Sequence, residues 1–450
     1  MQGIHGSDAA RILEKKGMTA LHQFTRRTFL KAAAAAITAP AIAPSTAFGL
    51  GGRAAPSERI TVAFIGAGRI TNNYHLRELL KFPDVEALCV CEVDKTRRDH
   101  ARRVVETAYS KESAYKGCGA YVDFRDLLQR KDLDAVCIAT PDHWHAIQLI
   151  EACKAKKDVY CEKPLTLTIA EAKLCVDAAR KHERVVQTGS QQRSSVFGQF
   201  RYGCEIVRSG RLGQIKTITV GVGNPSVPCD LPEEAMEPGL DWNLWLGQAP
   251  LRPYNSVLSP RGVHNSWPAW RAYREYSGGT HTDMGAHYYD TAQWALGMDG
   301  SGPVEIIPPD DPEATRGVKY IYENGVEMTH GGPDGCFFTG TKGTMHLARQ
   351  ILKTEPESLA KEPIGKEEVH LYESPGHHRD WINCIRSRKR PVADVEIGAR
   401  TATLIHLGNL AYWNHKKLRW DPRGWKFVGD EAASKWLDRE RREPWGLPVV

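Results

Sequence analysis

Five short apolar runs alternate with helix-like segments in the first half of this 450-residue chain. The runs cover residues 60–66, 85–92, 135–140, 158–162 and 185–188, and the helix-like segments lie near 72–81, 95–108, 145–156 and 169–181. Such alternation predicts a parallel sheet covered by helices on both faces, because parallel strands need a crossover between them. We therefore expect a doubly wound α/β domain over residues 58–188.

The pattern changes after about residue 189. Residues 215–222 alternate apolar and polar side chains, which is typical of a half-buried antiparallel strand. Further short strand candidates, separated by Gly and Pro, lie at 304–307, 318–322, 327–331, 336–339 and 344–347. They predict a second, α+β domain over residues 189–416 with an open, mostly antiparallel sheet. Helices near 378–387 and 397–414 and a charged tail over 417–450 complete the chain.

A glycine-rich loop, Gly66-Ala67-Gly68-Arg69-Ile70-Thr71, follows the first predicted strand and opens the first helix. Gly66 permits a tight turn, and Gly68 lets the backbone approach a pyrophosphate at the helix N-terminus. Glu92 ends the next strand, where an acid accepts hydrogen bonds from a ribose. The loop predicts a dinucleotide site and favours NAD, while Arg97 nearby leaves NADP open. The alternative is a glycine turn in another kind of βαβ protein.

The tripeptide Glu162-Lys163-Pro164 follows the strand predicted at 158–162. Ligands of open α/β sheets bind at the carboxyl ends of the strands, so Lys163 is placed to hydrogen-bond a substrate hydroxyl. On spacing alone, a solvated Glu-Lys pair is the better interpretation of these residues.

Asp283 and His287 are four residues apart, so on a helix they share one face. Histidine titrates near neutral pH and suits the role of general base. Two alternatives remain open. Asp283, His287 and Asp290 form a structural network, or His281 joins Asp283 and His287 at a metal. The chain has no Cys/His cluster with zinc spacing, and we predict no metal site.

The N-terminus has the features of an export signal. Arg26-Arg27 precedes an apolar, alanine-rich stretch, and Ser45-Thr46-Ala47 supplies small residues for cleavage. The form T-R-R-x-F-L-K resembles the bacterial twin-arginine signal, which is read by the machinery that exports folded proteins. We expect residues 1–47 to be removed and the mature protein to be periplasmic or otherwise extracytoplasmic. An amphipathic helix with a chance Arg pair is the alternative.

Charge and composition exclude several classes of protein. The formal net charge is +6, and residues 1–47 carry six basic and two acidic side chains, so the remainder has a net charge of only about +2. Without a clustered basic face, nucleic acid is not an expected partner. No apolar run reaches the roughly 20 residues that a membrane span needs. The eleven cysteines do not demand a disulfide.

The segments GAGRIT, TPDHWHA, CEKP and GGTHTDMGAHYYDTAQWALG, in this order, resemble the glucose-fructose oxidoreductase / inositol dehydrogenase / rhizopine catabolism (Gfo/Idh/MocA) family. LDWNLWLGQAP and the tail resemble its exported branch. The resemblance implies a Rossmann domain, a second open-sheet domain, bound NAD(P) and redox chemistry at a sugar or cyclitol carbon. It also implies that the open sheet is a surface for homo-oligomer formation.

The resemblance assigns roles to individual residues. Lys163 binds and polarises the reacting hydroxyl, His287 takes its proton, and Asp283 orients the pair. The cofactor contacts are predicted at Gly66, Gly68, Arg69, Ile70, Glu92, Arg97, Thr140, His143, His145, Glu162 and Lys163. The substrate contacts are predicted at Gln192, Arg193, Trp267, Trp270, Asp283 and His287.

Together these features predict an exported NAD(P)-dependent oxidoreductase acting on a sugar, glycoside or cyclitol. An exported protein has no nicotinamide pool around it, so we expect the cofactor to stay bound through turnover. One alternative is an NAD-dependent glycosidase whose cycle is redox-neutral, although the glycosidases of this family lack the EKP tripeptide. The other is a sugar-binding protein without catalytic activity.

Overall fold

The computed structural model describes residues 53–111, 115–194 and 198–450. The predicted export signal, residues 1–47, lies outside the described residues. Residues from Ser57 to Val450 form one unit, and both predicted domains lie within it. No helix in the described part of the chain combines the length and the apolar character needed to cross a membrane.

The first half forms a six-stranded parallel sheet, as the sequence predicted. Its order is β3-β2-β1-β4-β5-β6, so the chain winds outward in both directions from β1. The strands are β1 (Ile60–Ile65), β2 (Val85–Cys91), β3 (Gly119–Tyr121), β4 (Ala135–Ile138), β5 (Asp158–Cys161) and β6 (Val186–Thr188). β3 was not predicted, because three residues are too few to show a period.

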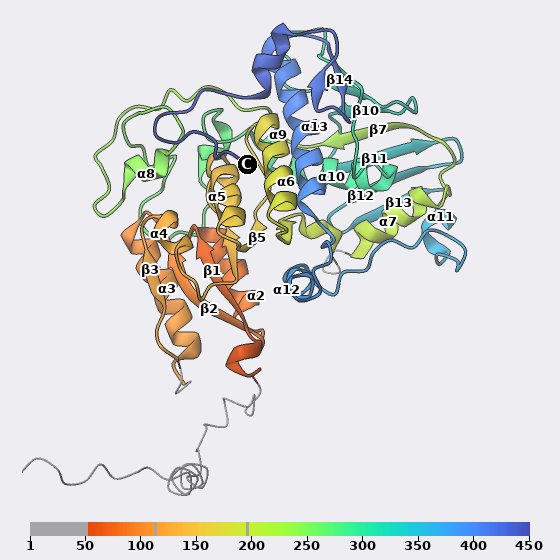
Figure 1. Ribbon diagram of the computed structural model, residues 1–450. Helices are drawn as coiled ribbons and strands as arrows, with labels where there is room; N and C mark the ends of the chain where they lie inside the picture. The colour runs from red at the N-terminus through yellow and green to blue at the C-terminus, as the bar shows by residue number, and fades with distance from the viewer. Residues whose placement is uncertain (1–52, 112–114, 195–197) are drawn as a thin grey trace, which may run out of the picture. The chain divides into compact units, whose positions relative to one another are not determined.

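Helices on both faces of this sheet separate the strands (Figure 1). They are α2 (Leu76–Leu79), α3 (Lys95–Tyr109), α4 (Phe124–Leu128), α5 (Asp142–Lys154) and α6 (Ile169–Lys181). Local sequence fixes where two of them begin. Asp94 caps α3 by accepting from the Arg97 amide, and Thr168 forms a capping box with Glu171 at the start of α6.

The second sheet has nine strands in the order β13-β12-β11-β7-β10-β9-β8-β14-β15. All neighbouring strands pair antiparallel except β7 and β10. The strands are β7 (Ile215–Gly221), β8 (Glu305–Ile307), β9 (Lys319–Ile321), β10 (Glu327–His330), β11 (Gly335–Gly340), β12 (Thr344–Ala348), β13 (Ile351–Glu355), β14 (Leu418–Asp421) and β15 (Lys426–Phe427). The predicted mostly antiparallel sheet is thus confirmed.

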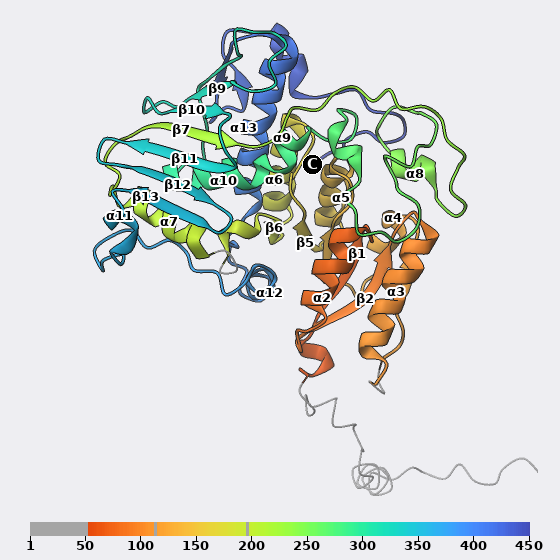
Figure 2. The ribbon, with the colours of Figure 1, turned by 180° about the vertical axis from the view of Figure 1, so that it is seen from behind.

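Helices cover one face of this second sheet (Figure 2). They are α7 (Gly198–Arg208), α10 (Gly285–Leu296) and α13 (Val395–Asn414). The opposite face is open, and Thr217, Phe337 and Lys353 are exposed on it. Alternation of buried and exposed residues along β7 and β11 is what a sheet with one solvated face requires.

Two late segments return to the first sheet. Helix α12 (His377–Ser387) buries Trp381 and Ile382 completely in a core that includes Phe64 of β1 and Tyr160 of β5. The segment predicted as a tail supplies β14 and β15 and then runs back, so that the Trp445 ring packs against the Trp144 ring with centroids 4.9 Å apart. Residues late in the sequence therefore pack on the first sheet, so the two structural halves do not correspond to two continuous stretches of sequence.

A long segment over residues 222–276, here called the cover segment, lies across the carboxyl edge of the first sheet. It contains α8 (Trp242–Leu246), the 3-10 turn η6 (Ala269–Ala272) and a small apolar core of its own. Backbone hydrogen bonds join it to the first half, from the Lys95 amide to the Gly239 carbonyl (3.0 Å), from the Asp241 amide to the Val93 carbonyl (3.1 Å) and from the His143 amide to the Tyr276 carbonyl (3.2 Å). Figures 1 and 2 show α8 near α4, beyond the strand ends.

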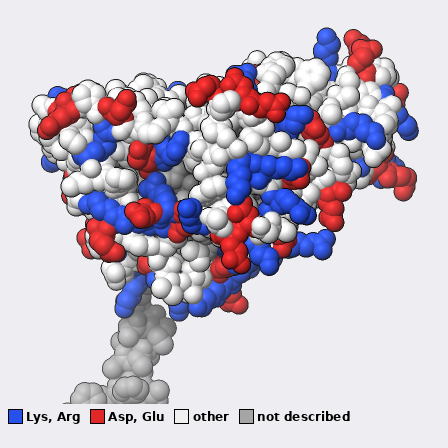
Figure 3. Space-filling model, turned by 90° about the horizontal axis from the view of Figure 1, so that it is seen from above, with Lys and Arg blue, Asp and Glu red and all other residues white. Residues whose placement is uncertain are grey.

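Charged side chains of both signs are intermixed on the face seen in Figure 3. The eleven cysteines are all free, and ten of them are buried. They pack as small apolar side chains in the two cores.

Candidate active site

A cavity of about 770 Å³ lies where the carboxyl ends of β1, β4 and β5 meet the cover segment and α10. This volume is typical of a site for a cofactor together with a small substrate. Its wall combines the glycine-rich loop, Thr140, Lys163, His287 and the turn at 267–272. Residues predicted from separate motifs therefore share one cavity.

The glycine-rich loop is built for close approach by a ligand. Gly66 has φ +88°, and a Cβ there would lie 2.8 Å from the Ala139 carbonyl carbon and oxygen. At Gly68, by contrast, a Cβ would meet nothing within 4 Å, so space is open beside the backbone. Thr71, in the place of a third glycine, turns its hydroxyl back onto the Gly66 carbonyl at 2.6 Å.

Glu92 and Arg97 both line the cavity, but Glu92 keeps free acceptor sites, whereas Arg97 is bonded to protein groups. The Glu92 carboxylate accepts from the Ala67 amide (2.8 Å) and the Asp94 amide (3.0 Å), which leaves lone pairs for ribose hydroxyls. The Arg97 guanidinium instead donates to the Gly262 and Pro260 carbonyls of the cover segment. A 2′-phosphate would have to compete for it, which favours NAD.

The residues present fit a dinucleotide. Beside the open space at Gly68, the Nε of Arg69 is buried and has no hydrogen-bond partner among the residues that the structure describes. An unpartnered guanidinium nitrogen at a helix start suits a pyrophosphate. Gly66, Gly68, Arg69, Ile70 and Glu92 would hold the cofactor here, and Thr140 also lies on the wall.

Lys163, Asp283 and His287 come from three elements. Lys163 follows β5, Asp283 ends α9 (Thr280–Asp283), and His287 lies in the first turn of α10. The Lys163 Nζ donates to the Asp283 Oδ1 at 2.7 Å and to the Asp283 backbone carbonyl at 2.8 Å. An ammonium has three N–H groups, so one remains for a substrate hydroxyl.

The charges of this group are set by burial and by each other. Burial raises the pKa of Asp283, but the cations Lys163 and Arg271 outweigh it and hold that pKa at about 2. Burial, with the nearby cations Lys163 and Arg349, pushes the pKa of His287 well below its usual value. His287 is therefore neutral at neutral pH, and its buried Nδ1 has no partner among the described residues. A neutral imidazole next to a cationic lysine is suited to accept a proton.

The alternative metal site with His281 is not formed. His281 is buried and bonds Asn409 (2.7 Å) and Tyr289 (3.2 Å), and it does not line the cavity. Over residues 53–111, 115–194 and 198–450, no three His, Cys, Asp or Glu side chains form a group that could hold a metal ion.

Glu162 reaches the cavity wall, but protein groups occupy its carboxylate. His75 Nε2 lies 3.3 Å from Oε1, and Gln191 donates to the same oxygen at 2.8 Å. Burial raises the pKa of Glu162, yet His75, Lys163 and His287 outweigh it and bring that pKa to about 2. Glu162 also accepts a hydrogen bond from the Lys163 amide at 3.2 Å and so supports the backbone there. Because protein groups occupy its carboxylate, Glu162 does not present a free carboxylate for the predicted cofactor contact.

His143 and His145 were predicted to contact the cofactor, and the structure corrects both. Neither lines the cavity. His145 has one ring nitrogen 2.8 Å from the Pro164 carbonyl and the other 2.9 Å from the Thr140 carbonyl. His143 Nε2 lies 3.1 Å from the Trp245 carbonyl, and burial lowers its pKa to about 3. The rings hold the strand-end loops and the cover segment together.

Gln192 and Arg193, predicted to bind substrate, are also buried away from the cavity. Arg193 forms a bidentate pair with Asp290 (2.7 and 2.9 Å) and a second pair with Asp299 (2.6 Å). Gln192 accepts from the Thr291 hydroxyl at 3.1 Å. The neighbouring Gln191 lines the cavity instead. In a short 3-10 turn, one residue of shift decides which side chain faces the ligand.

Trp267 and Trp270 do line the cavity, as does a residue that the sequence did not single out. Arg271 lies between them and approaches Asp283, with its Nε 3.4 Å from Oδ1. Asp142 is a second missed wall residue. It accepts from the Ser277 hydroxyl at 2.6 Å, and burial raises its pKa to about 7. The sequence analysis singled out neither residue, although Arg271 follows Trp270 and Asp142 lies in the TPDHWHA segment. The Ser277 partner of Asp142 is 135 residues away.

Two family models match this chain. One, described as the oxidoreductase family's NAD-binding Rossmann fold, covers residues 60–190, and the other, described as the family's C-terminal alpha/beta domain, covers residues 224–447. The chain belongs to the Gfo/Idh/MocA oxidoreductase family. Its first half is accordingly an NAD-binding Rossmann domain, and the predicted family and NAD as the cofactor are confirmed.

Curated relatives match over part of their length only. The uncharacterized oxidoreductase YrbE of Bacillus subtilis is 29% identical over 172 residues, which is 38% of this chain and 47% of that protein. A glycosyl hydrolase family 109 protein of Shewanella baltica is 30% identical over 217 residues, which is 43% of this chain and 45% of that protein. The chain thus matches less than half the length of these relatives.

Solved structures share the fold at low identity. The WlbA dehydrogenase of Bordetella pertussis, in complex with NADH and UDP-GlcNAcA, is 19% identical with a TM-score of 0.54, over 81% of this chain and 98% of that one. The aldose-aldose oxidoreductase of Caulobacter crescentus, complexed with glycerol, is 16% identical with a TM-score of 0.54, over 80% and 100%.

Proposed function

We propose that this protein is an exported NAD-dependent oxidoreductase that acts on a hydroxyl of a sugar, glycoside or cyclitol. The observation that carries the proposal is the contact between the Lys163 Nζ and the Asp283 carboxylate at 2.7 Å, in one cavity with His287 and the glycine-rich loop. A cation, an ionised acid and a neutral imidazole are the groups that oxidation of an alcohol needs.

Each residue then has a defined part in the reaction. Lys163 donates its remaining N–H to the substrate hydroxyl oxygen and stabilises negative charge there. His287 takes the hydroxyl proton, and Asp283 holds the ammonium in place. When bound, NAD supplies the acceptor for the hydride that leaves the substrate carbon bearing the hydroxyl. In the reverse direction, the protonated His287 returns the proton to the carbonyl oxygen.

Retention of the cofactor through turnover is part of the proposal. The cover segment is tied to the cofactor half by the Arg97 bonds to Gly262 and Pro260 and by the Asn73 amide, which donates to Asn265 at 3.0 Å. Release of a dinucleotide would require this segment to move. Export by the twin-arginine route, suggested by Arg26-Arg27, supports the same conclusion, because folded proteins leave with their cofactor.

A panel of sugars, uronates, glycosides and cyclitols tests the activity. Purified protein is mixed with each compound, and the reduced-nicotinamide absorbance of the bound cofactor is followed. A change with at least one class is expected, and no change with any class would refute oxidoreduction. Cell fractionation and the N-terminal sequence of the mature protein test export separately.

An NAD-dependent glycosidase is the second candidate, favoured by the similarity to the glycosyl hydrolase family 109 protein. In such a cycle the sugar is oxidised and reduced again, so the cofactor ends unchanged. Product analysis separates the two functions. A keto sugar indicates net oxidation, and a released alcohol together with an unoxidised sugar indicates glycosidase activity.

A further inference from the structure

We propose that Arg271 is a positioning residue of the reaction, and that its own place is set by the cofactor loop through Trp267. This inference concerns the proposed reaction and therefore rests on it. Arg271 belongs to η6 of the cover segment, which is remote in sequence from Lys163 and the glycine-rich loop.

Two indole rings hold the Arg271 guanidinium. Its Cζ lies 4.1 Å from the centre of the Trp270 ring and 5.0 Å from the centre of the Trp267 ring. A guanidinium packed on aromatic faces keeps the N–H groups at its edge free to donate. One edge nitrogen donates to the Pro268 carbonyl at 3.2 Å, and Nε points to the Asp283 Oδ1 at 3.4 Å.

The same carboxylate oxygen is approached by two cations. Lys163 donates to Oδ1 at 2.7 Å, while Arg271 lies 3.4 Å from it. Asp283 is largely buried, with 19% of its side chain exposed, so this charge is poorly screened by water. Because Arg271 bears part of the charge of Asp283, Lys163 keeps its third N–H directed at the substrate instead of closing on the carboxylate.

The other end of this arrangement touches the cofactor loop. The Arg69 guanidinium lies over the same Trp267 ring, with its Cζ 4.0 Å from the centre. Trp267 is thus packed between an arginine of the dinucleotide site and an arginine of the catalytic group. A Trp267 side chain that is 53% exposed has no deep core to hold it, so Arg69 and Arg271 define its position.

Four titratable groups face Asp283. They are Lys163 after β5, Arg271 on η6, His287 on α10 and Asp142 at the start of α5. Arg271 and Lys163 stabilise the ionised form of Asp283, whereas the neighbouring carboxyl of Asp142 opposes it. Removal of the Arg271 charge must therefore raise the pKa of Asp283. As the pH falls, Asp283 then becomes protonated at a higher pH and releases Lys163.

The test compares Arg271→Gln and Arg271→Met with Arg271→Lys and a matched control. Arg274→Gln is the control, because Arg274 lies three residues on, its Cζ is 4.1 Å from the Trp413 ring, and it does not line the cavity. The pH profile of kcat/KM is measured on whichever sugar turns over, together with the bound NAD content of each variant.

In the two neutral variants the acid limb of the profile is expected to move up by about one pH unit, a usual shift for loss of a neighbouring charge. Arg271→Lys restores the limb, and Arg274→Gln leaves it unchanged. An acid limb that stays in place in both neutral variants, with NAD content intact, would overturn the proposal. So would an equal shift in Arg274→Gln.

A second measurement needs no substrate. Difference infrared spectra follow the protonated carboxyl band during acid titration, and Asp283→Asn identifies the Asp283 band. The band is expected to appear at a higher pH in Arg271→Gln than in the wild type, and an unchanged titration would overturn the proposal. If the wild type turns over no sugar, the proposed function fails, while this titration still decides the role of Arg271.

Discussion

Two glycines of the cofactor loop, Gly66 and Gly68, should respond differently to the same substitution. Gly66 has φ +88°, and its Cβ would lie within 2.9 Å of backbone atoms of Ala139 and Thr140, which follow β4. Gly68 has no such strain, and its Cβ would enter empty space. We therefore expect Gly66→Ala to damage the fold and Gly68→Ala to damage only cofactor binding.

The cost at Gly66 has two parts. A left-handed backbone costs an alanine about 1–2 kcal/mol, and forcing a methyl group against packed atoms costs about 1–3 kcal/mol. The contacts at Gly66 are backbone atoms of the two residues that follow β4, and backbone atoms cannot turn away as a side chain does. Gly66→Ala should thus lower the free energy of unfolding by about 2–5 kcal/mol. This is a large part of the total stability of a typical domain.

The expectation for Gly68→Ala is the reverse. Stability should stay within about 0.5 kcal/mol of the wild type, or rise slightly, because alanine has less freedom than glycine in the unfolded chain. The new methyl group occupies the space through which the pyrophosphate would pass. Bound NAD should therefore fall at least about tenfold, the factor that corresponds to roughly 1.4 kcal/mol.

Urea unfolding followed by circular dichroism gives the stability of each variant. The NAD released on denaturation, per mole of chain, gives the occupancy after incubation with NAD. Gly300→Ala is the matched control, since its Cβ also meets nothing within 4 Å and it lies outside the cavity wall. Wild-type stability in Gly66→Ala would refute the loop geometry. Full NAD content in Gly68→Ala would refute the placement of the pyrophosphate.

Three further changes have outcomes that the structure fixes. Lys163→Met should keep bound NAD and lower kcat by about 10²–10³-fold, the usual cost of removing one donor to a developing negative charge, as steady-state kinetics would show. Burial raises the pKa of Asp142 to about 7, so the folded state holds a proton that the unfolded state has lost. Stability from this group is therefore full below about pH 4 and declines toward about pH 7, and urea unfolding at the two pH values should show a smaller decline in Asp142→Asn. Arg441→Met removes a guanidinium 3.0 Å from the carboxylate of the fully buried Glu171. Among the described residues, the Leu167 and Thr168 amides and the Gln248 side chain then remain as its partners. Unfolding free energy should fall by about 3 kcal/mol, against under about 0.5 for Lys173→Met at an exposed pair.

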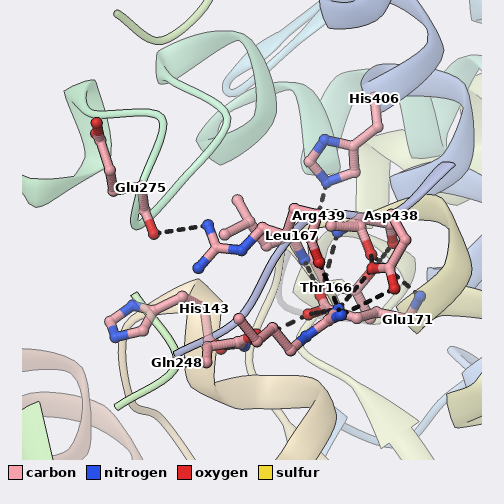
Figure 4. Close-up of polar contacts among 11 residues, drawn as sticks. His143, Thr166, Leu167, Glu171, Gln248, Glu275, His406, Asp438 and Arg439 are labelled. Carbon is pink, nitrogen blue, oxygen red and sulfur yellow. Dashed lines mark hydrogen bonds and ion pairs between the residues drawn. The ribbon is translucent and has the colours of Figure 1, made fainter. Parts of the chain in front are cut away.

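The last of these changes concerns the return of the chain to the first sheet. Figure 4 shows Asp438 and Arg439 of this returning segment beside Glu171, Gln248 and His143. Arg439 donates to the Glu275 carbonyl at 2.9 Å and so also contacts the cover segment. If Arg441→Met proves no less stable than Lys173→Met, the segment is not what holds these elements together.

Local pattern was enough to predict the parallel sheet and the edge on which Lys163 lies, while the roles of Lys163, Asp283 and His287 came from the resemblance to the family. Each parallel strand delivers the residue after it to the same edge, so Lys163 and the glycine-rich loop had to meet. The spacing of Asp283 and His287 predicted one helical face, but the structure divides them between α9 and α10. The contact of Lys163 with Asp283 spans 120 residues, so local pattern does not contain it.

The wrong predictions concern residues whose surroundings come from far along the chain. Arg193 was expected to bind a sugar, but its partner Asp290 is 97 residues away, and their pairing turns the side chain inward. His143 follows a strand end, like Lys163, yet the cover segment buries it against the Trp245 carbonyl. Local pattern indicates which edge a residue lies on and leaves open whether a later segment covers that edge.

The cover segment also explains why cofactor and substrate sites should not behave independently. It supplies the carbonyls that hold Arg97, the amide group that holds Asn73 and the turn that carries Arg271. A movement that frees the dinucleotide must shift Trp267 and with it the second cation on Asp283. The enzyme is therefore expected to lose catalytic geometry whenever it opens to exchange NAD, so that only the form with its cofactor enclosed turns over substrate.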